Sequence, residues 1–167
     1  MKISMGKFPK SGERRIDIKI ENFDTWNLDH SIAMILYPAL LQLKEIKQGL
    51  PSEFAEVGGE DWSPQQCFDF YSETTSACFA LGEKRWDEVM DKMIWSFQQL
   101  CLANYDDKYH HGEMKIRWTE EDSQGLSTMI DENPTEHWYD NVGHQLHQDR
   151  IQEGLDLFAR YYRNLGD

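Results

Sequence analysis

The sequence lacks the short motifs by which many enzymes are recognised. It has no Gly-x-Ser-x-Gly turn for a nucleophilic serine, no glycine-rich phosphate loop and no His-Glu-x-x-His metal motif. A missing motif does not exclude catalysis, but together these absences favour a protein that binds a partner over one that catalyses a reaction. We therefore expect no enzymatic activity and no cofactor.

Long hydrophobic runs are also missing. No stretch approaches the ~18 consecutive apolar residues of a membrane span. The N-terminal sequence "MKISMGKFPKSGERR" has no apolar segment of the kind found in signal peptides. We therefore expect no membrane partner, and we expect the protein to stay in a cytosol.

Cysteine is scarce. The three cysteines, Cys67, Cys78 and Cys101, form no Cys-x-x-Cys pair, which disfavours both a zinc site and a disulfide framework. We expect them to be reduced thiols in the core.

The histidines form no recognisable metal motif either. His144 and His147 share a helix face at a three-residue spacing, and His110 and His111 precede a predicted strand. A zinc site needs three or four ligands in a fixed geometry, and no cysteine lies at a suitable spacing. We interpret these histidines as polar residues of a helix start and a loop, and we predict no metal site.

Positive charge is in short supply. The chain has 17 Lys and Arg residues against 30 Asp and Glu residues, a net charge of −13, which argues against binding of long nucleic acid through a basic surface. The charge is uneven, because residues 1–20 carry six basic and two acidic side chains, a net +4, and the remaining residues carry −17. A small anion can find a cationic pocket near residues 1–20, although a basic terminal segment is more often simply hydrated.

The composition is that of a folded domain. Hydrophobic residues make up 40% and aromatic residues 13% of the 167-residue chain, which suffices for one packed core. Alternating apolar and polar residues in "RRIDIKI" (14–20) and "MKIRW" (114–118) predict two strands, which can pair into a small antiparallel sheet. The side chains predicted to face inward are Ile16, Ile18, Ile20, Met114, Ile116 and Trp118.

Three main helices are predicted over residues 29–48, 86–103 and 141–164, because apolar residues recur there at spacings of three and four. The predicted stripes are Ile32, Ile35, Leu36, Ala39, Leu43 and Ile46; Trp86, Met90, Met93, Phe97 and Leu100; and Ile151, Leu155, Phe158, Tyr162 and Leu165. A shorter helix can open at Ser63-Pro64, and residues 119–140 look irregular. The predicted fold class is α+β, mostly α, with a small antiparallel sheet in a single domain of residues 1–167.

The first helix is apolar on two sides. Met34, Tyr37 and Leu41 lie opposite its main stripe, and a helix that is apolar nearly all round is buried on both sides. In a chain of this size, such a helix is either central or shared with another subunit. We therefore expect a homo-oligomer.

Trp95 occupies the polar side of the second predicted helix, beside Asp91 and Lys92. An exposed tryptophan is unfavourable unless it meets a partner. Such a residue can be a hot spot of a subunit contact, or it can stack on a base whose phosphate a nearby cation holds. We expect Trp95 to pack against another helix or subunit, with a ligand contact as the alternative.

The order of four segments resembles a family of small proteins carried by tailed bacteriophages. The segments are "RRIDIKI", "DTWNLDHSIAMILYPALLQLKEIKQG", "RWDEVMDKMIWSFQQL" and "RIQEGLDLFARYYRNLGD". The resemblance covers most of the chain apart from residues 50–80 and 119–140. This sequence has Gln48 where similar proteins tend to carry a histidine, and Gly166 where they tend to carry a tryptophan near the C-terminus.

This family is similar to the anti-CBASS sponge proteins, which bind cyclic nucleotide immune signals in an oligomer. The resemblance implies a non-enzymatic protein in the host bacterial cytoplasm that binds a cyclic dinucleotide and keeps it from host effectors. Aromatic stacking and pairing of Arg or Lys with phosphate would hold the ligand. The candidate ligand-binding residues are Arg14, Arg15, Lys19, Trp26, Tyr37 and Trp95.

Two other functions compete with this one. The first is an acidic protein that inhibits a basic host protein by imitating DNA, with carboxylates from residues 119–140 and from Asp87, Glu88 and Asp91. The second is a metal-dependent enzyme. Its candidate ligands would be Asp24, Asp29, Asp87 and Asp91, since paired carboxylates can bind Mg²⁺.

Overall fold

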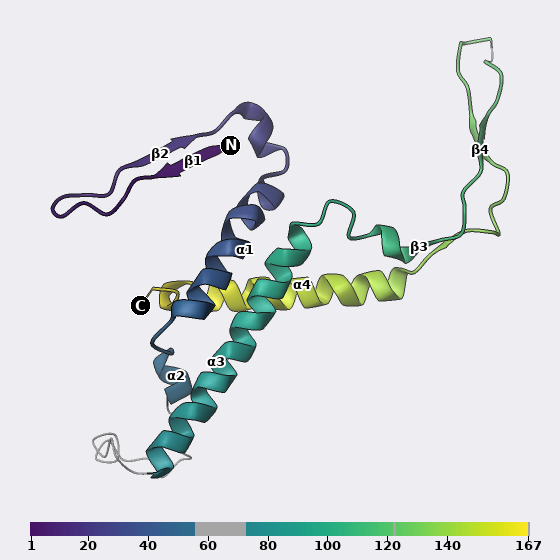
Figure 1. Cartoon of the computed structure of the whole chain (residues 1–167). Helices are drawn as coiled ribbons and strands as arrows, with labels where there is room; N and C mark the ends of the chain where they lie inside the picture. Colours follow the sequence, from purple (N-terminus) through teal and green to yellow (C-terminus); the bar gives the residue numbers. More distant parts are fainter. Residues whose placement is uncertain (56–72, 122, 167) are drawn as a thin grey trace. The chain divides into compact units, whose positions relative to one another are not determined.

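The computed structural model describes residues 1–55, 73–121 and 123–166. The chain divides into two compact units, Met1–Leu102 with Ile151–Asp167, and Ala103–Arg150. Helices dominate, and the strands form antiparallel pairs in two-stranded sheets (Figure 1). The predicted α+β, mostly α class is therefore confirmed, while the single domain stays a prediction.

The predicted main helices are all present, with different ends. In the first unit α1 spans Leu28–Ile46, the short α2 spans Ser52–Ala55, and α3 spans Glu73–Leu100. Helix α4 spans Asn141–Tyr161 and is followed by the 3-10 helix η4, Tyr162–Asn164. Helix α3 therefore begins earlier than its apolar stripe predicts. The short helix expected at Ser63-Pro64 lies outside the described residues.

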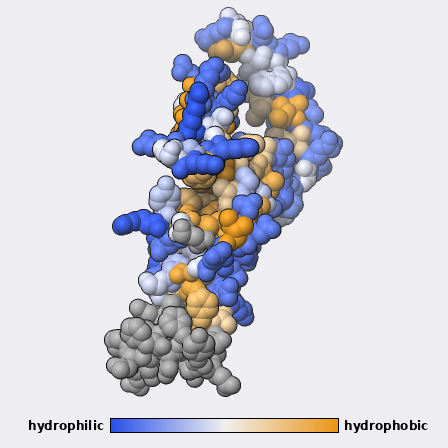
Figure 2. Space-filling view, turned by 60° about the vertical axis from the view of Figure 1, so that its left-hand side comes forward, coloured by the Kyte–Doolittle hydropathy of each residue, from blue (hydrophilic) through white to orange (hydrophobic). Residues whose placement is uncertain are grey.

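Helix α1 does have two apolar sides, but its buried side is not the predicted one. Ala33 and Leu40 are its buried residues, and Leu36, Tyr37 and Leu43 pack partly against the core. The rest of the predicted stripe is exposed, namely Ile32, Ile35, Ala39 and Ile46. The prediction was wrong by a rotation of the helix, because a helix that is apolar nearly all round does not show which side faces its neighbour. Hydrophobic residues, coloured orange, are visible at the surface in Figure 2.

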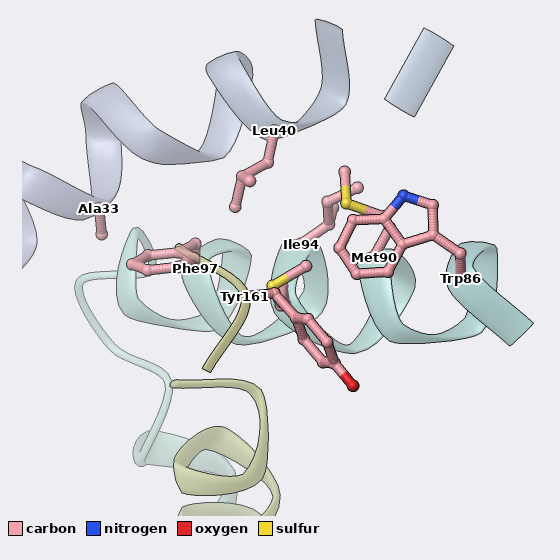
Figure 3. Close-up of a cluster of buried hydrophobic side chains, with 8 residues drawn as sticks. Ala33, Leu40, Trp86, Met90, Ile94, Phe97 and Tyr161 are labelled. Atoms are coloured by element: carbon pink, nitrogen blue, oxygen red, sulfur yellow. The ribbon is translucent and has the colours of Figure 1, made fainter. Parts of the chain in front are cut away.

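The core of the first unit is built on the predicted stripe of α3. Trp86, Met90, Met93 and Phe97 are buried, and Leu100 is partly buried, so this stripe is confirmed. Leu40 of α1 and Tyr161 at the end of α4 pack against it (Figure 3). The Tyr161 ring meets the Trp86 indole edge to face, with the ring centres 5.2 Å apart, a geometry that aromatic pairs favour.

The polar side of α3, on which Trp95 lies, contacts the neighbouring helices. Asp91 forms an ion pair of 2.5 Å with Lys44 of α1, and Lys92 forms one of 2.5 Å with Glu153 of α4. Trp95, one turn further along α3, is half-buried. The polar residues around Trp95 are therefore the rim of a helix interface rather than a fully hydrated face.

Helix α4 crosses α3 at a glycine. A Cβ atom on the buried Gly154 would lie 2.0 Å from Ser96 Oγ and 2.6 Å from the Lys92 carbonyl oxygen. The sequence prediction placed Tyr162 in the core, but Tyr162 is 65% exposed and Tyr161 is buried instead. The helix changes to the 3-10 form after Tyr161, so the regular spacing of the stripe no longer applies there.

The two predicted strands exist but do not pair with each other. Strand β2, Ile16–Lys19, pairs antiparallel with β1, Lys2–Met5, and strand β4, Ile116–Trp118, pairs with β5, Met129–Asp131. The predicted common sheet was therefore wrong. All six side chains that were predicted to face inward are exposed, at 47–62% of their maximal surface for Ile16, Ile18, Ile20, Met114, Ile116 and Trp118.

The second unit contains more regular structure than the sequence suggested. It holds the 3-10 helix η3, Asp107–Tyr109, and the strand pair β3, His110–His111, with β6, Trp138–Tyr139. Strands β5 and β6 both fall in residues 119–140, which were expected to be irregular. Strands of two or three residues are too short to show a periodicity of two.

Among the described residues, no helix has the length and apolarity needed to cross a membrane. Cys101 is a free, partly buried thiol, and burial raises its pKa. Cys67 and the side chain of Cys78 lie outside the described residues.

Candidate functional site

Arg14, the first candidate ligand residue, closes the loop of the β1–β2 hairpin. Its Nε atom donates a hydrogen bond of 2.6 Å to the carbonyl oxygen of Gly6. Its guanidinium carbon lies 4.5 Å from the centre of the Phe8 ring, within the range of a cation–π contact. Arg14 therefore organises the loop through neighbours of its own hairpin.

Arg15 and Lys19 are exposed cations with local acidic partners. Arg15 pairs with Asp17 at 2.9 Å, and Lys19 pairs with Glu21 at 3.1 Å. Exposed pairs of this kind contribute at most about 1 kcal/mol, so a phosphate can replace the carboxylate at little cost. Together with Arg14 these residues make the hairpin cationic.

Trp26 is the most exposed of the aromatic candidates. It follows the 3-10 helix η1, Asn22–Thr25, is 77% exposed, and stacks on Phe23 with the ring centres 4.8 Å apart. Asp24, which lies between Phe23 and Trp26 in the sequence, accepts hydrogen bonds from the N-terminal ammonium of Met1 and from the Glu21 backbone N–H. These bonds lower the pKa of the Asp24 carboxyl, and the bond from the ammonium has the largest effect. The outer face of the pair is open to a planar ligand.

The remaining two candidates belong to the helical packing. Tyr37 of α1 packs partly against the core, and Trp95 of α3 is half-buried. The six candidates therefore do not form one site. Three lie in the hairpin, one follows it, and two lie in separate helices. None of them lines the cavities of the described structure that are bordered by Lys47, by His111 and by Ile35.

A cavity of about 240 Å³ in the first unit combines cations with an aromatic side chain. It lies where α1 ends, and its wall includes Lys47, Trp86 of α3, and Arg163, Asn164 and Gly166 after α4. None of these five residues was predicted to bind a ligand. We call this the Lys47–Arg163 cavity.

Helix ends position both cations of this cavity. Helix α1 stops at Ile46, and Lys47 takes an extended conformation while its N–H donates to the Leu43 carbonyl at 2.8 Å. Lys47 Nζ lies 3.1 Å from Asp87 Oδ1, with only 9% of the lysine side chain exposed. A cation at a helix C-terminus is also favoured by the exposed carbonyls of the last turn. The 3-10 helix η4 carries Arg163 and Asn164, which also line the cavity.

The polar side chains of the Lys47–Arg163 cavity are of the types that bind a small anion. An arginine offers a planar fork of N–H donors that fits a phosphate, and a lysine ammonium adds a point charge. The Asn164 amide can donate or accept a hydrogen bond, which suits a sugar hydroxyl or a base edge. Asp87 neutralises part of the charge, so two cations and one carboxylate leave the group net positive.

A second cavity, of about 370 Å³, lies in the second unit and is lined mainly by imidazole and aromatic rings. The β3–β6 pairing places His111 opposite Trp138, and their rings stack with centres 4.1 Å apart. Trp138 is 59% exposed. A planar group can stack on such a ring pair, but the described wall of this cavity holds no lysine or arginine.

Gly112 and His137 fix this wall. Gly112 has φ +82°, and a Cβ there would lie 2.0 Å from the Glu136 carbonyl oxygen, so only glycine fits. His137 Nε2 lies 3.3 Å from Asp131 Oδ2, and its buried Nδ1 has no hydrogen-bond partner among the described residues.

Of the histidines interpreted as loop and helix-start residues, His110 is exposed and His147 is buried. His147 is 7% exposed, its Nδ1 accepts a hydrogen bond from Lys108 Nζ at 3.0 Å, and its ring stacks on Tyr105. Burial first, then the nearby cations including Lys108, lower the pKa of His147. Burial and then Asp106 raise the pKa of Tyr139, whose ring centre lies 5.5 Å from that of His144. Among described residues, no group of three or more His, Cys, Asp or Glu could hold a metal ion.

Neither cavity was predictable from local sequence patterns, because their walls come from segments far apart in the chain. Lys47 and Arg163 are separated by most of the sequence, and neither lies in a motif. Comparison of the chain with protein-family models, with curated proteins and with solved structures found no match.

Proposed function

We propose that this chain is a phage-encoded, non-enzymatic protein that sequesters a cyclic nucleotide immune signal in the host bacterial cytoplasm. In this proposal it acts as a homo-oligomer, as the anti-CBASS sponge proteins that it resembles do. It holds the messenger without cleaving it, so host effectors are deprived of their signal by mass action.

The observation that carries the proposal is the Lys47–Arg163 cavity. It gathers two cations, an amide and a tryptophan in a chain whose residues after position 20 carry a net −17. At this overall charge, long-range attraction of an anion is weak, but screening over ~10 Å leaves the nearby cations in control. A cyclic nucleotide presents phosphates, which match the two cations, and base edges, which match the Asn164 amide.

The resemblance to phage proteins supports the same cavity. The two departures from that family are Gln48 and Gly166. Gly166 lines the cavity, and Gln48 lies between the lining residues Lys47 and Gly49. The open space left by a glycine in place of a tryptophan would change which base the cavity accepts.

Native mass spectrometry with a panel of cyclic di- and trinucleotides tests the proposal. We expect the wild-type protein to retain one nucleotide, and Arg163→Gln to lower its retention at least tenfold. The matched control is Arg117→Gln, because Arg117 pairs with Glu132 on the second unit at 2.8 Å and lies outside the cavity. A wild-type protein that ignores the whole panel would contradict the proposal, as would equal losses in both variants.

The acidic-inhibitor function remains a second candidate because the chain carries a net −13. Its predicted carboxylate face is partly neutralised, since Asp87 pairs with Lys47 and Asp91 with Lys44. This function predicts capture of a basic host protein that is lost as salt is raised.

A metal-dependent enzyme is the third candidate, and its four carboxylates are engaged differently. Asp24 bonds the N-terminal ammonium, and Asp87 and Asp91 bond lysines. Asp29 lies in the first turn of α1. This function predicts an activity that a chelator abolishes.

A further inference from the structure

The N-terminal hairpin has one apolar face that the described residues of its unit leave largely exposed. The register of β1 with β2 places Ile3 opposite Ile18 and Met5 opposite Ile16, and directly opposed residues project from the same side of a sheet. Met5, Ile16 and Ile18 are 55%, 52% and 59% exposed. An isolated two-stranded hairpin is marginally stable in water unless its apolar face packs on something.

Helix α1 carries a second uncovered apolar surface. Leu28, Ile32 and Ile35 are 41%, 40% and 38% exposed, and Ile46 is 57% exposed. At ~100° per residue these four residues and Ala39 fall on one side of the helix. This stripe therefore runs the length of α1, beside the side that packs on α3.

The two surfaces are continuous. A hollow of about 290 Å³ is lined by Met1 and Ile3 from the hairpin and by Ser31, Met34 and Ile35 from α1. Ile3 of the hairpin face and Ile35 of the helix stripe thus border the same space. We call the combined surface the hairpin–α1 face; its members are Ile3, Met5, Ile16, Ile18, Leu28, Ile32, Ile35, Ala39 and Ile46.

We propose that the hairpin–α1 face is covered by the same face of a second copy of this chain. Contiguous apolar patches of this kind mark protein interaction sites. In a two-fold dimer the same surface of each partner forms the contact. The hairpin of each copy therefore covers α1 of the other copy.

Charge favours a second copy over other occupants. Residues 1–20 carry +4 and the remaining residues −17, so the cationic hairpin of one copy is attracted to the net acidic remainder of the other. Nucleic acid would meet this acidic remainder, and a strongly basic protein would meet the cationic hairpin. The inference rests on the oligomer that the proposed function requires, and it names the surface that forms it.

Light scattering coupled to size-exclusion chromatography tests the surface. We expect wild-type protein to have at least twice the mass of one chain, and Ile18→Glu and Ile35→Glu each to reduce it at least twofold. Ile18 lies in the hairpin, away from the helical core, so its substitution reports on association even if Ile35→Glu disturbs α1. A wild-type mass of one chain overturns the proposal, as does an unchanged mass in both variants.

Leu41→Glu is the matched control. Leu41 lies on the same helix as Ile35 and is exposed to a similar degree, 43% against 38%, but it is on another side of α1. We expect Leu41→Glu to keep the wild-type mass. An equal loss of mass in Leu41→Glu and Ile35→Glu overturns the assignment of the face. Nucleotide retention is measured on the same samples. An oligomer that depends on Ile18 and Ile35 but retains no nucleotide supports the surface and refutes the proposed function. Nucleotide retention together with an unchanged mass in Ile18→Glu and Ile35→Glu supports the proposed function and refutes the surface.

Discussion

At the residue scale, His147 is a buried imidazole beside a cation. Its Nδ1 atom accepts from the Lys108 ammonium at 3.0 Å, and His144 and Arg150 add to the effect of burial in lowering its pKa. The neutral form with the proton on Nε2 fits this arrangement, because the ammonium is a donor only. Protonation of Nδ1 would replace a hydrogen bond with a contact between two positive charges.

This predicts that the second unit loses stability as the pH falls below about 6.5. The unfolded histidine has a pKa near 6.5 and the folded one a lower pKa, so in that range the unfolded state binds more protons and unfolding becomes easier. We expect amide hydrogen exchange in residues 103–150 to be faster at pH 5.5 than at pH 7.5 after correction for the intrinsic rate. His147→Gln should flatten this dependence, and His110→Gln, at an exposed position, should keep it. If His147→Gln also keeps the pH dependence of exchange, protonation of His147 is not its cause.

At the element scale, the contact of α3 with α4 depends on the absence of a side chain. Gly154 approaches Ser96 and the Lys92 carbonyl too closely for a Cβ atom. The Lys92–Glu153 ion pair lies beside this crossing, and its exposed position makes it a minor contributor. Close packing at Gly154 therefore decides the separation of the two helices.

Gly154→Ala should destabilise the first unit by about 1–3 kcal/mol, the usual cost of overpacking. For a chain of this length that corresponds to a drop of roughly 2–12 °C in the melting temperature, measured by circular dichroism at 222 nm. Gln152→Ala, at an exposed position two residues earlier on α4, should change the melting temperature much less. Equal melting temperatures for Gly154→Ala and the wild type would contradict the described crossing.

The elements also show where sequence patterns suffice and where they do not. The α3 stripe from Trp86 to Phe97 was predictable because it has one apolar side. On α1 the apolar residues surround the helix, so periodicity selected Ile32 and Ile35 although Ala33 and Leu40 are the buried pair. Strand partners are decided by tertiary contacts, which explains why Ile16–Lys19 was found and its partner Lys2–Met5 was not.

The candidate site was less predictable than the fold. A basic cluster such as Arg14, Arg15 and Lys19 is visible in sequence, but those cations have partners within their own segment. The cations of the Lys47–Arg163 cavity come together only because α1 and α4 end near each other on the first unit. No local pattern encodes such a meeting of distant helix ends.

At the scale of the whole molecule, the two proposals assign separate surfaces to two properties. The proposed function places the ligand in the Lys47–Arg163 cavity, and the further inference places the contact between subunits on the hairpin–α1 face. Both lie on the first unit, and each has its own variant, Arg163→Gln for the cavity and Ile18→Glu for the face. A sponge also needs protein in excess of its messenger, because sequestration acts by mass action.

The most direct test of the central claim is recovery of the nucleotide after binding. The protein is incubated in excess with the cyclic nucleotide that native mass spectrometry selects, then heat-denatured, and the released nucleotide is quantified by chromatography. The account predicts that free nucleotide disappears before denaturation and that the intact cyclic molecule returns quantitatively after it. A linear or otherwise cleaved product would contradict sequestration and indicate an enzyme, and nucleotide that stays free throughout would contradict binding itself.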